Sequence, residues 1–164
     1  MILGMTALTF VHVVLSLVGI FSGLVVAFGL LAAERLDGWT AVFLATTVAT
    51  SVTGFFFPFH KLLPSHGVGI ISLVVLSVAI LARYGRHLAG AWRRTYVITA
   101  LTALYLNVFV LIVQLFLKVP ALKAMAPTQS EPPFKLAQLA VLVLFIVLGI
   151  FGTMRFRSER RPTA

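Results

Sequence analysis

Long apolar runs make up most of the chain, and its charged residues stand in short stretches between them. A helix needs about 20 consecutive apolar residues to cross about 30 Å of hydrocarbon. Several runs approach or exceed this length with almost no charge, and they predict transmembrane helices over residues 3–33, 40–59, 62–82, 96–117 and 134–154. The third is the least regular, because Pro64 stands near its start and its uninterrupted part, residues 67–82, is short for a full span. A segment that only dips into the membrane is the alternative.

Composition points to the same class of protein. Hydrophobic residues make up 60% of the 164 residues and charged residues 10%, and the mean hydropathy is +1.09. A soluble domain of this size cannot bury so large an apolar fraction. We therefore expect an all-α integral membrane bundle of five transmembrane helices, one domain over residues 1–154, followed by a short basic cytoplasmic tail over 155–164. The first run lacks the basic front of a cleaved secretory signal, so we expect it to remain.

Basic residues divide between the two ends of the predicted helices. With five crossings, the loops 34–39 and 83–95 share one side with the tail and contain every arginine. The other side contains every lysine: Lys61, Lys118, Lys123 and Lys135. Because the basic residues of short loops stay in the cytoplasm, the sequence predicts an amino terminus outside and a carboxyl terminus inside.

The net charge of +9 therefore has an explanation at the membrane surface. The arginines are spread over short loops and interleaved with Trp39, Tyr84 and Trp92, aromatic residues that suit the headgroup layer. Clustered elements that would read bases or follow a nucleic-acid backbone are absent from the sequence. Anionic lipid is the partner that this pattern favours, and nucleic acid is not.

Polar side chains within the predicted spans fall on a few helical faces. His12 shares a face with Ser16, Gly19 and Gly23, and the Gly19-x-x-x-Gly23 spacing lets helices approach closely. A second stripe follows Thr46, Thr50, Thr53 and Phe57, and a third follows Thr99, Ala103, Asn107 and Gln114. Polar groups in a membrane usually face the bundle interior, so we expect the three stripes to face one another. Interhelical hydrogen bonds without a ligand are the alternative for each group.

The predicted outer side carries two proline-bearing loops. His60 and His66 flank the first, and the second, residues 117–138, contains four prolines and the acidic Glu131. Glu131 stands just before the fifth span, where a carboxylate suits the positive helix end, so a capping role is as reasonable as a functional one. Gln138 lies one turn inside that helix. We expect these groups to surround a funnel that opens outward.

A non-catalytic binding role is the first functional hypothesis. The funnel would hold a hydrophobic small molecule such as a quinone or lipid, with polar groups fixing its head and the phenylalanines of 55–59 supplying part of the wall. These phenylalanines also suit ordinary packing against lipid. The candidate ligand-binding residues are His12, Thr50, Asn107, Gln114, Glu131 and Gln138.

A haem or metal site is the second hypothesis. His12 could pair with His60 or His66 across a b-type haem, with Lys61 or Lys118 near the propionates. Haem-binding bundles generally place both ligands within helices, whereas His60 and His66 stand at a turn, which counts against this reading. The absence of cysteine excludes thiolate metal sites and iron–sulfur clusters. A copper or zinc ion on the same histidines lacks any short ligand motif.

An accessory role is the third hypothesis. The small size and the Gly19/Gly23 face are compatible with a homo-oligomer or with a subunit of a larger membrane complex. A transporter is less favoured, because no inverted repeat and no buried relay beyond His12 is evident. The sequence shows no nucleophile with a partnering base and no carboxylate pair, so enzymatic catalysis is not expected.

Three segments carry a resemblance to known proteins: TSVTGFFFPF, ALYLNVFVL and KVPALKAMAPTQSEPPF. They resemble segments of small multi-pass proteins that recur in bacterial genomes as uncharacterised membrane proteins, over most of the chain from the second span onward. This resemblance implies a bacterial inner-membrane protein and implies no activity. A looser similarity to haem-handling four-helix membrane proteins rests on His12 alone.

Overall fold

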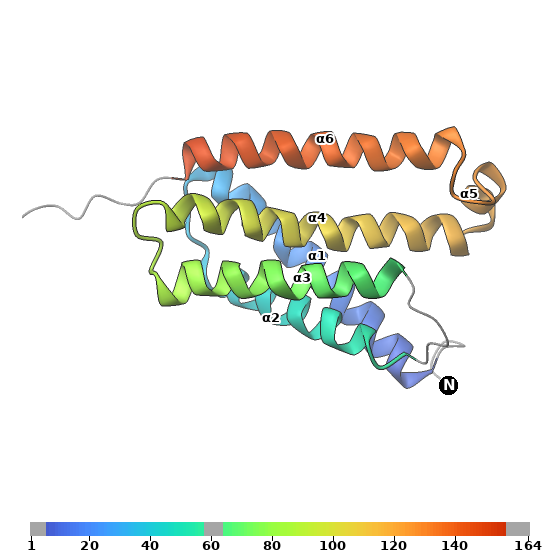
Figure 1. The fold of residues 1–164 in the computed structure, drawn as a ribbon, viewed down its shortest axis with the longest axis horizontal. Helices are drawn as coiled ribbons and strands as arrows, with labels where there is room; N and C mark the ends of the chain where they lie inside the picture. Colours follow the sequence, from blue (N-terminus) through green and yellow to red (C-terminus); the bar gives the residue numbers. More distant parts are fainter. Residues whose placement is uncertain (1–5, 58–63, 157–164) are drawn as a thin grey trace, which may run out of the picture.

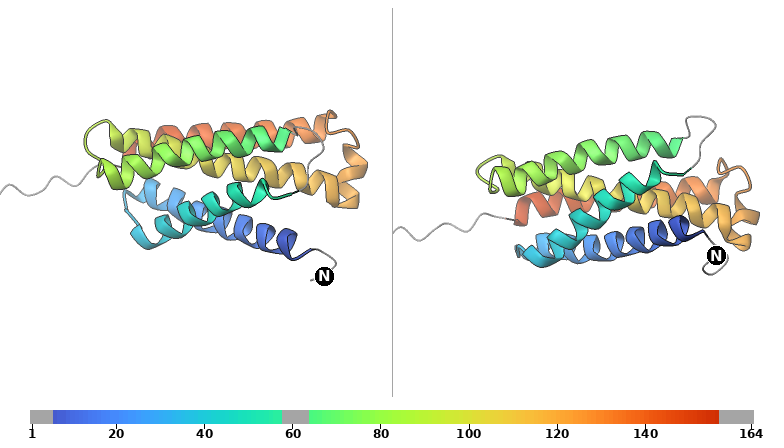
Figure 2. Two further views of the ribbon diagram at one scale, coloured as in Figure 1. Left: turned by 60° about the horizontal axis from the view of Figure 1, so that its bottom comes forward. Right: turned by 90° about the horizontal axis from the view of Figure 1, so that it is seen from below.

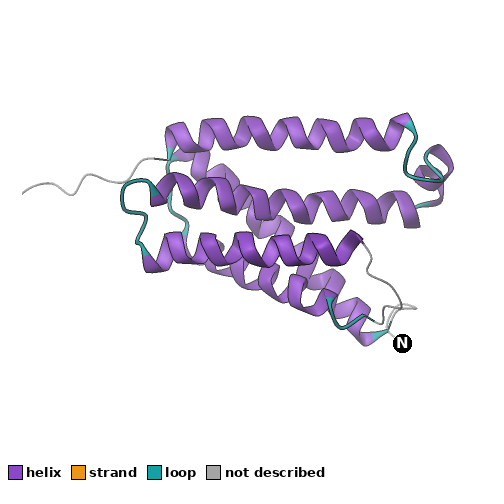
Figure 3. Cartoon of the chain, viewed as in Figure 1, coloured by secondary structure: helices purple, strands orange, loops and turns teal. Residues whose placement is uncertain are grey.

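The computed structural model describes residues 6–57 and 64–156, which form helices and connecting turns without a strand (Figures 1 and 3). The helices are α1 (Ala7–Ala32), α2 (Asp37–Gly54), α3 (Pro64–Ile80), the π-helical turn η1 (Leu81–Gly85), α4 (Trp92–Lys118), α5 (Pro120–Met125) and α6 (Pro132–Arg155). The predicted all-α class is confirmed, and each predicted span corresponds to one long helix. The short helix α5 and the π turn were not predicted.

The long helices form an antiparallel bundle around α4. Among the described elements, α4 contacts every other helix, and α1 and α2 form a closely packed pair. Figure 2 shows that this pair is inclined to α3, α4 and α6, whose axes are nearly aligned with one another. Because successive long helices reverse direction, the described arginines lie at or near one end of the bundle and the described lysines at the other (Figure 1). We call these the arginine end and the lysine end; His12 and His66 lie toward the lysine end.

Glycines on α1 allow its close approach to two neighbours. A Cβ atom added at Gly23 would come within 2.6 Å of Leu104 Cδ1 on α4 and 2.9 Å of the Phe43 ring on α2. One added at Gly19 would lie 3.1 Å from Thr47 Oγ1 and 3.5 Å from Asn107 Nδ2. The glycine face of α1 therefore packs against both α2 and α4, which brings the three polar stripes together as the sequence predicted.

Four of the described helices are long and apolar enough to cross a membrane: α1, the continuous stretch His66–Gly85, α4 and α6. The third predicted span, interrupted near its start by Pro64, is among them. Of the helices at the five predicted spans, α2 is not among those long and apolar enough to cross. It has 18 residues, of which five are threonines and one is a serine. Several of these hydroxyls donate to carbonyls one turn earlier in the same helix, as Thr50 does to Thr46 (2.8 Å) and Ser51 to Thr47 (3.0 Å).

The last helix, α6, is the most peripheral. Only 6% of its most apolar stretch is buried, against 28–44% for the other three candidate spans. Its buried residues are Phe145 and Gly152, and its outer surface consists of large aliphatic and aromatic side chains. In water such a surface would be unstable, whereas in a bilayer it is satisfied by acyl chains. The described structure is thus consistent with a membrane protein.

Candidate functional site

His12 is half-buried against the last turns of α2. Its Nδ1 atom forms a 2.9 Å hydrogen bond with the Thr53 hydroxyl, and its ring meets Phe57 edge-on at 5.1 Å between centroids. The ring also lies beside Gly54, where an added Cβ atom would be 3.7 Å from His12 Cε1, an ordinary van der Waals contact. The other ring nitrogen, Nε2, forms no hydrogen bond within the described residues. His12 thus faces protein on one side and has a free donor or acceptor on the other.

Asn107 lies deeper in the bundle and is buried. Its Nδ2 atom donates to Thr47 Oγ1 at 3.3 Å and links α4 to α2. Ser51 forms a similar link with Ser72 on α3 at 3.2 Å. Thr50 is also buried, but its hydroxyl donates to its own helix. The structure therefore uses Asn107 and Thr50 for internal hydrogen bonds, and Thr53 is the threonine of the second stripe that reaches His12.

The two glutamines of the predicted pocket lie in different surroundings. Gln138 donates from Nε2 to the Phe109 carbonyl of α4 at 3.2 Å, while its Oε1 is buried and forms no hydrogen bond within the described residues. Gln114 is exposed. At the lysine end, the first turns of α1 and of α6 lie on opposite sides of α4 (Figure 1). His12 bonds to Thr53 of α2 and Gln138 to α4, so the described hydrogen bonds do not join these two residues, and the common funnel stays a prediction.

Glu131 organises the loop before α6. Its carboxylate accepts hydrogen bonds from the Thr128 hydroxyl (2.7 Å), the Thr128 amide (3.2 Å) and the Ser130 amide (3.1 Å). The Thr128 hydroxyl bond is the main cause that holds the pKa of Glu131 below its ordinary value. Glu131 occupies the N-cap position of α6, but its side chain does not bond to that helix. Its observed role is to hold the loop, which Gln129 also ties to the Val113 carbonyl at 2.9 Å.

Two of the histidines proposed as haem or metal ligands, His12 and His66, pack against different phenylalanines at the end of α2. His66 packs against Phe55, with 6.0 Å between ring centroids, whereas His12 packs against Thr53 and Phe57. His60 lies outside the described residues. Within the described ranges, no group of three or more His, Cys, Asp or Glu side chains could hold a metal ion. That finding concerns metal ions with three such ligands, and the haem hypothesis stays a prediction.

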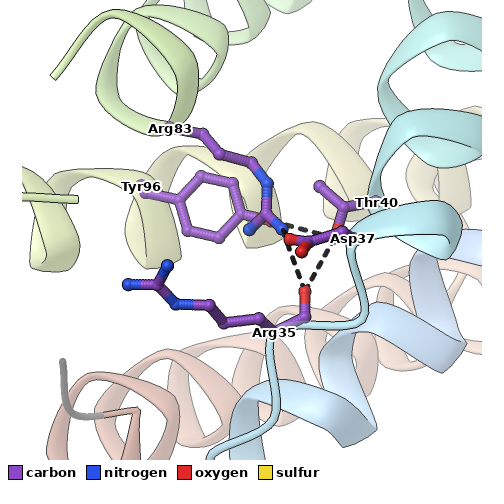
Figure 4. A network of polar contacts seen from close by, with 5 residues as sticks. All are labelled: Arg35, Asp37, Thr40, Arg83 and Tyr96. Carbon is purple, nitrogen blue, oxygen red and sulfur yellow. Dashed lines mark hydrogen bonds and ion pairs between the residues drawn. The ribbon is translucent and has the colours of Figure 1, made fainter. Parts of the chain in front are cut away.

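A buried arginine at the opposite end was not singled out from the sequence. Figure 4 shows Arg83 of η1 pointing between Tyr96 of α4 and the turn that joins α1 to α2. Its Nη2 atom donates to the Arg35 carbonyl at 3.0 Å and to Asp37 Oδ1, and its guanidinium lies 5.2 Å from the Tyr96 ring centroid. Tyr96 is fully buried and donates to Thr40 Oγ1 at a long 3.5 Å. We call Arg83, Asp37, Thr40, Tyr96 and the Arg35 carbonyl the Arg83 network.

The Arg83 network joins three separate elements at the arginine end. Arg83 is only 6% exposed, whereas the side chain of Asp37 is 83% exposed. The sequence signal was an arginine directly after an apolar run, together with an acid in the preceding loop. That signal indicates a charged loop equally well, so the long-range contact could not be read from it.

Comparison with known protein families, curated proteins and solved structures gave no match. The functional conclusion therefore depends on the geometry of the described residues.

Proposed function

We propose that this chain is a five-span protein of the bacterial inner membrane, with its amino terminus outside, that holds a hydrophobic small molecule such as a quinone or lipid. The role is non-catalytic. In this proposal α2 is the fifth crossing, because it lies alongside helices that are long enough to span. Its hydroxyls are compatible with lipid since they bond within α2 or to neighbouring helices.

The observation that carries the proposal is the half-buried His12 with one ring nitrogen engaged and the other available. Thr53 fixes the orientation of the ring through Nδ1, and Phe57 limits its movement from the side. Nε2 can then donate to or accept from the polar head of a ligand, according to the tautomer. Ligand sites of this kind combine an apolar wall with a few oriented polar groups. The ligand would lie beside the seam of α1 and α2.

The test is the content of the purified protein. Protein isolated in mild detergent would be extracted with organic solvent, and quinones and lipids would be quantified by mass spectrometry. We expect stoichiometric retention in the wild type and a loss of about tenfold in His12→Phe, since one hydrogen bond to a ligand contributes about 1.5 kcal/mol. Thr53→Val should show a smaller loss, because the imidazole remains but is no longer oriented.

The matched control is His87→Phe, which removes an exposed histidine at the arginine end. It should retain as much ligand as the wild type. Equal retention by His12→Phe and His87→Phe would contradict the proposal. An absorption spectrum of the same sample tests the haem alternative, because a Soret band lost in His12→Ala would identify a haem in place of a quinone or lipid.

An accessory role is a second candidate, and the exposed face of α6 favours it. This helix buries few residues, so its surface is available to another transmembrane helix as well as to lipid. The test is the mass of the gently solubilised protein. A stable homo-oligomer or a stoichiometric partner that is lost in Ile146→Trp would support the role, and a monomer would contradict it.

A further inference from the structure

A cleft of about 400 Å³ lies at the arginine end between α4 and α6. Arg93, Arg94 and Ile98 of α4 form one wall, and Thr153 and Met154 of α6 form the other. The cleft lies at the opposite end of the bundle from His12, and none of its lining residues belongs to the Arg83 network. It combines two cations with an apolar lining.

The two arginines of the cleft have no partner within the described residues. Neither guanidinium forms a hydrogen bond or an ion pair there, and Nη1 of Arg93 is buried without a partner. A buried guanidinium nitrogen without an acceptor is costly, so this position favours an anion that can approach it. Three acids are described: Glu34 and Asp37 stand at the arginine end and Glu131 at the other, and the one ion pair that they form there joins Asp37 to Arg83, so none pairs with Arg93 or Arg94.

The lining of the cleft includes apolar side chains next to the two arginines. Ile98 is 54% exposed and lies about one turn further toward the middle of α4 than the arginines, and Met154, beside the last residue of α6, is 63% exposed. Trp92 and Tyr84, which suit the headgroup layer, lie at the same end of the bundle. A ligand that fits both the arginines and the apolar side chains has an anionic head and an apolar tail.

We infer that the cleft between α4 and α6 binds the phosphate of an anionic phospholipid, with Arg93 and Arg94 as its ligands. The planar guanidinium groups donate to the phosphate oxygens, and an acyl chain follows Ile98 and Met154. The site adds a defined position to the general attraction of anionic lipid by the arginine end. It is independent of the proposed function at His12.

The experiment is native mass spectrometry of the full chain released from detergent, titrated with phosphatidylglycerol, phosphatidylcholine or inorganic phosphate. The wild type should bind one phosphatidylglycerol about tenfold more tightly than phosphatidylcholine. Arg93→Gln/Arg94→Gln should lose about tenfold of that affinity. The matched control Arg35→Gln/Arg86→Gln removes the same charge at the same end but outside the cleft, and it should bind like the wild type.

A second variant keeps both arginines. Ile98→Trp fills the cleft, so it should weaken binding of phosphatidylglycerol even if the double glutamine variant fails to fold. Equal losses in the two double variants would overturn the inference, because they would show attraction by net charge alone. Displacement of phosphatidylglycerol by millimolar inorganic phosphate would also overturn it, because the occupant would then be a free anion.

Discussion

Gly23 is a residue at which α1 tolerates little change. An added methyl group would press on Leu104 and Phe43 at less than 3.0 Å, and both of these side chains are fully buried. Overpacking of this kind costs about 1–3 kcal/mol. We expect Gly23→Ala to lower the midpoint of thermal unfolding in detergent by several degrees, at about 2–4 °C per kcal/mol for a chain of this size.

The chain offers a matched control for that substitution. A Cβ atom added at Gly149 of α6 would meet nothing within 4 Å. Gly149→Ala should therefore leave the midpoint unchanged or raise it slightly, because alanine favours the helix. A Gly23→Ala protein that unfolds at the temperature of Gly149→Ala would show that the close approach of α1 to α2 and α4 does not limit stability.

Single residues differ in how far the sequence reveals their role. The four-residue spacing of Gly19 and Gly23 indicated a close contact, and both glycines are buried. The second stripe contained Thr53, but spacing alone could not separate it from Thr50, which bonds within its own helix. Which threonine reaches His12 depends on how α2 is rotated about its axis relative to α1, and only the packed structure determines that rotation.

At the scale of elements, the Arg83 network ties η1 to the turn between α1 and α2. Arg83→Lys keeps the charge but loses the guanidinium fork and the flat face that lies over Tyr96. We expect it to destabilise the protein by about 1.5–3 kcal/mol, the contribution of hydrogen bonds to a charged group. Asp37→Asn should cost less than about 1 kcal/mol, because Asp37 is exposed.

The control for this network is Arg35→Lys. Arg35 contributes its backbone carbonyl, and its side chain points away from the network (Figure 4). Denaturation in mixed micelles would compare the free energies of unfolding of the wild type, Arg83→Lys, Asp37→Asn and Arg35→Lys. If Arg83→Lys and Arg35→Lys unfold alike, the buried guanidinium does not stabilise this end of the bundle.

The loop before α6 should respond to acid. The pKa of Glu131 is lowered in the folded protein, so its carboxylate stabilises the loop above the ordinary carboxyl pKa, and this contribution is lost as the pH falls through the lowered value. The amides of Thr128 and Ser130 should exchange hydrogen faster at a pH below the folded pKa, relative to the intrinsic rates. In Glu131→Gln the same amides should show little pH dependence. Equal profiles in the two proteins would show that this carboxylate does not hold the loop.

Helix limits were predictable where a residue breaks or caps the helix. Pro64, Pro120 and Pro132 stand at the starts of α3, α5 and α6, as the fixed φ of proline favours. The π turn at η1 was not predicted, because no proline or cap marks it in the sequence; it contains Arg83, which bonds to the α1–α2 turn.

At the scale of the whole molecule, hydropathy and the spacing of charges determined the class and the antiparallel order. They could not determine which helix is central, because α1, α4 and α6 are about equally apolar. Burial separates them: α4 contacts every described helix, and α6 exposes most of its length. A single outer funnel was expected from depth along the helices alone, whereas the hydrogen bonds of His12 and Gln138 run to different helices, α2 and α4.

The orientation and the fifth crossing can be tested together, because the chain has no cysteine. Gly38 lies in the first turn of α2 and Gly67 in the first turn of α3; both are exposed, and an added Cβ atom meets nothing within 4 Å at either. We expect an impermeant maleimide to label Gly67→Cys in intact cells and Gly38→Cys only after permeabilisation. Labelling of both from one side would show that α2 does not cross. The reverse pattern would place the arginine end outside, where the cytoplasmic preference of basic loops could no longer account for the arrangement of charge.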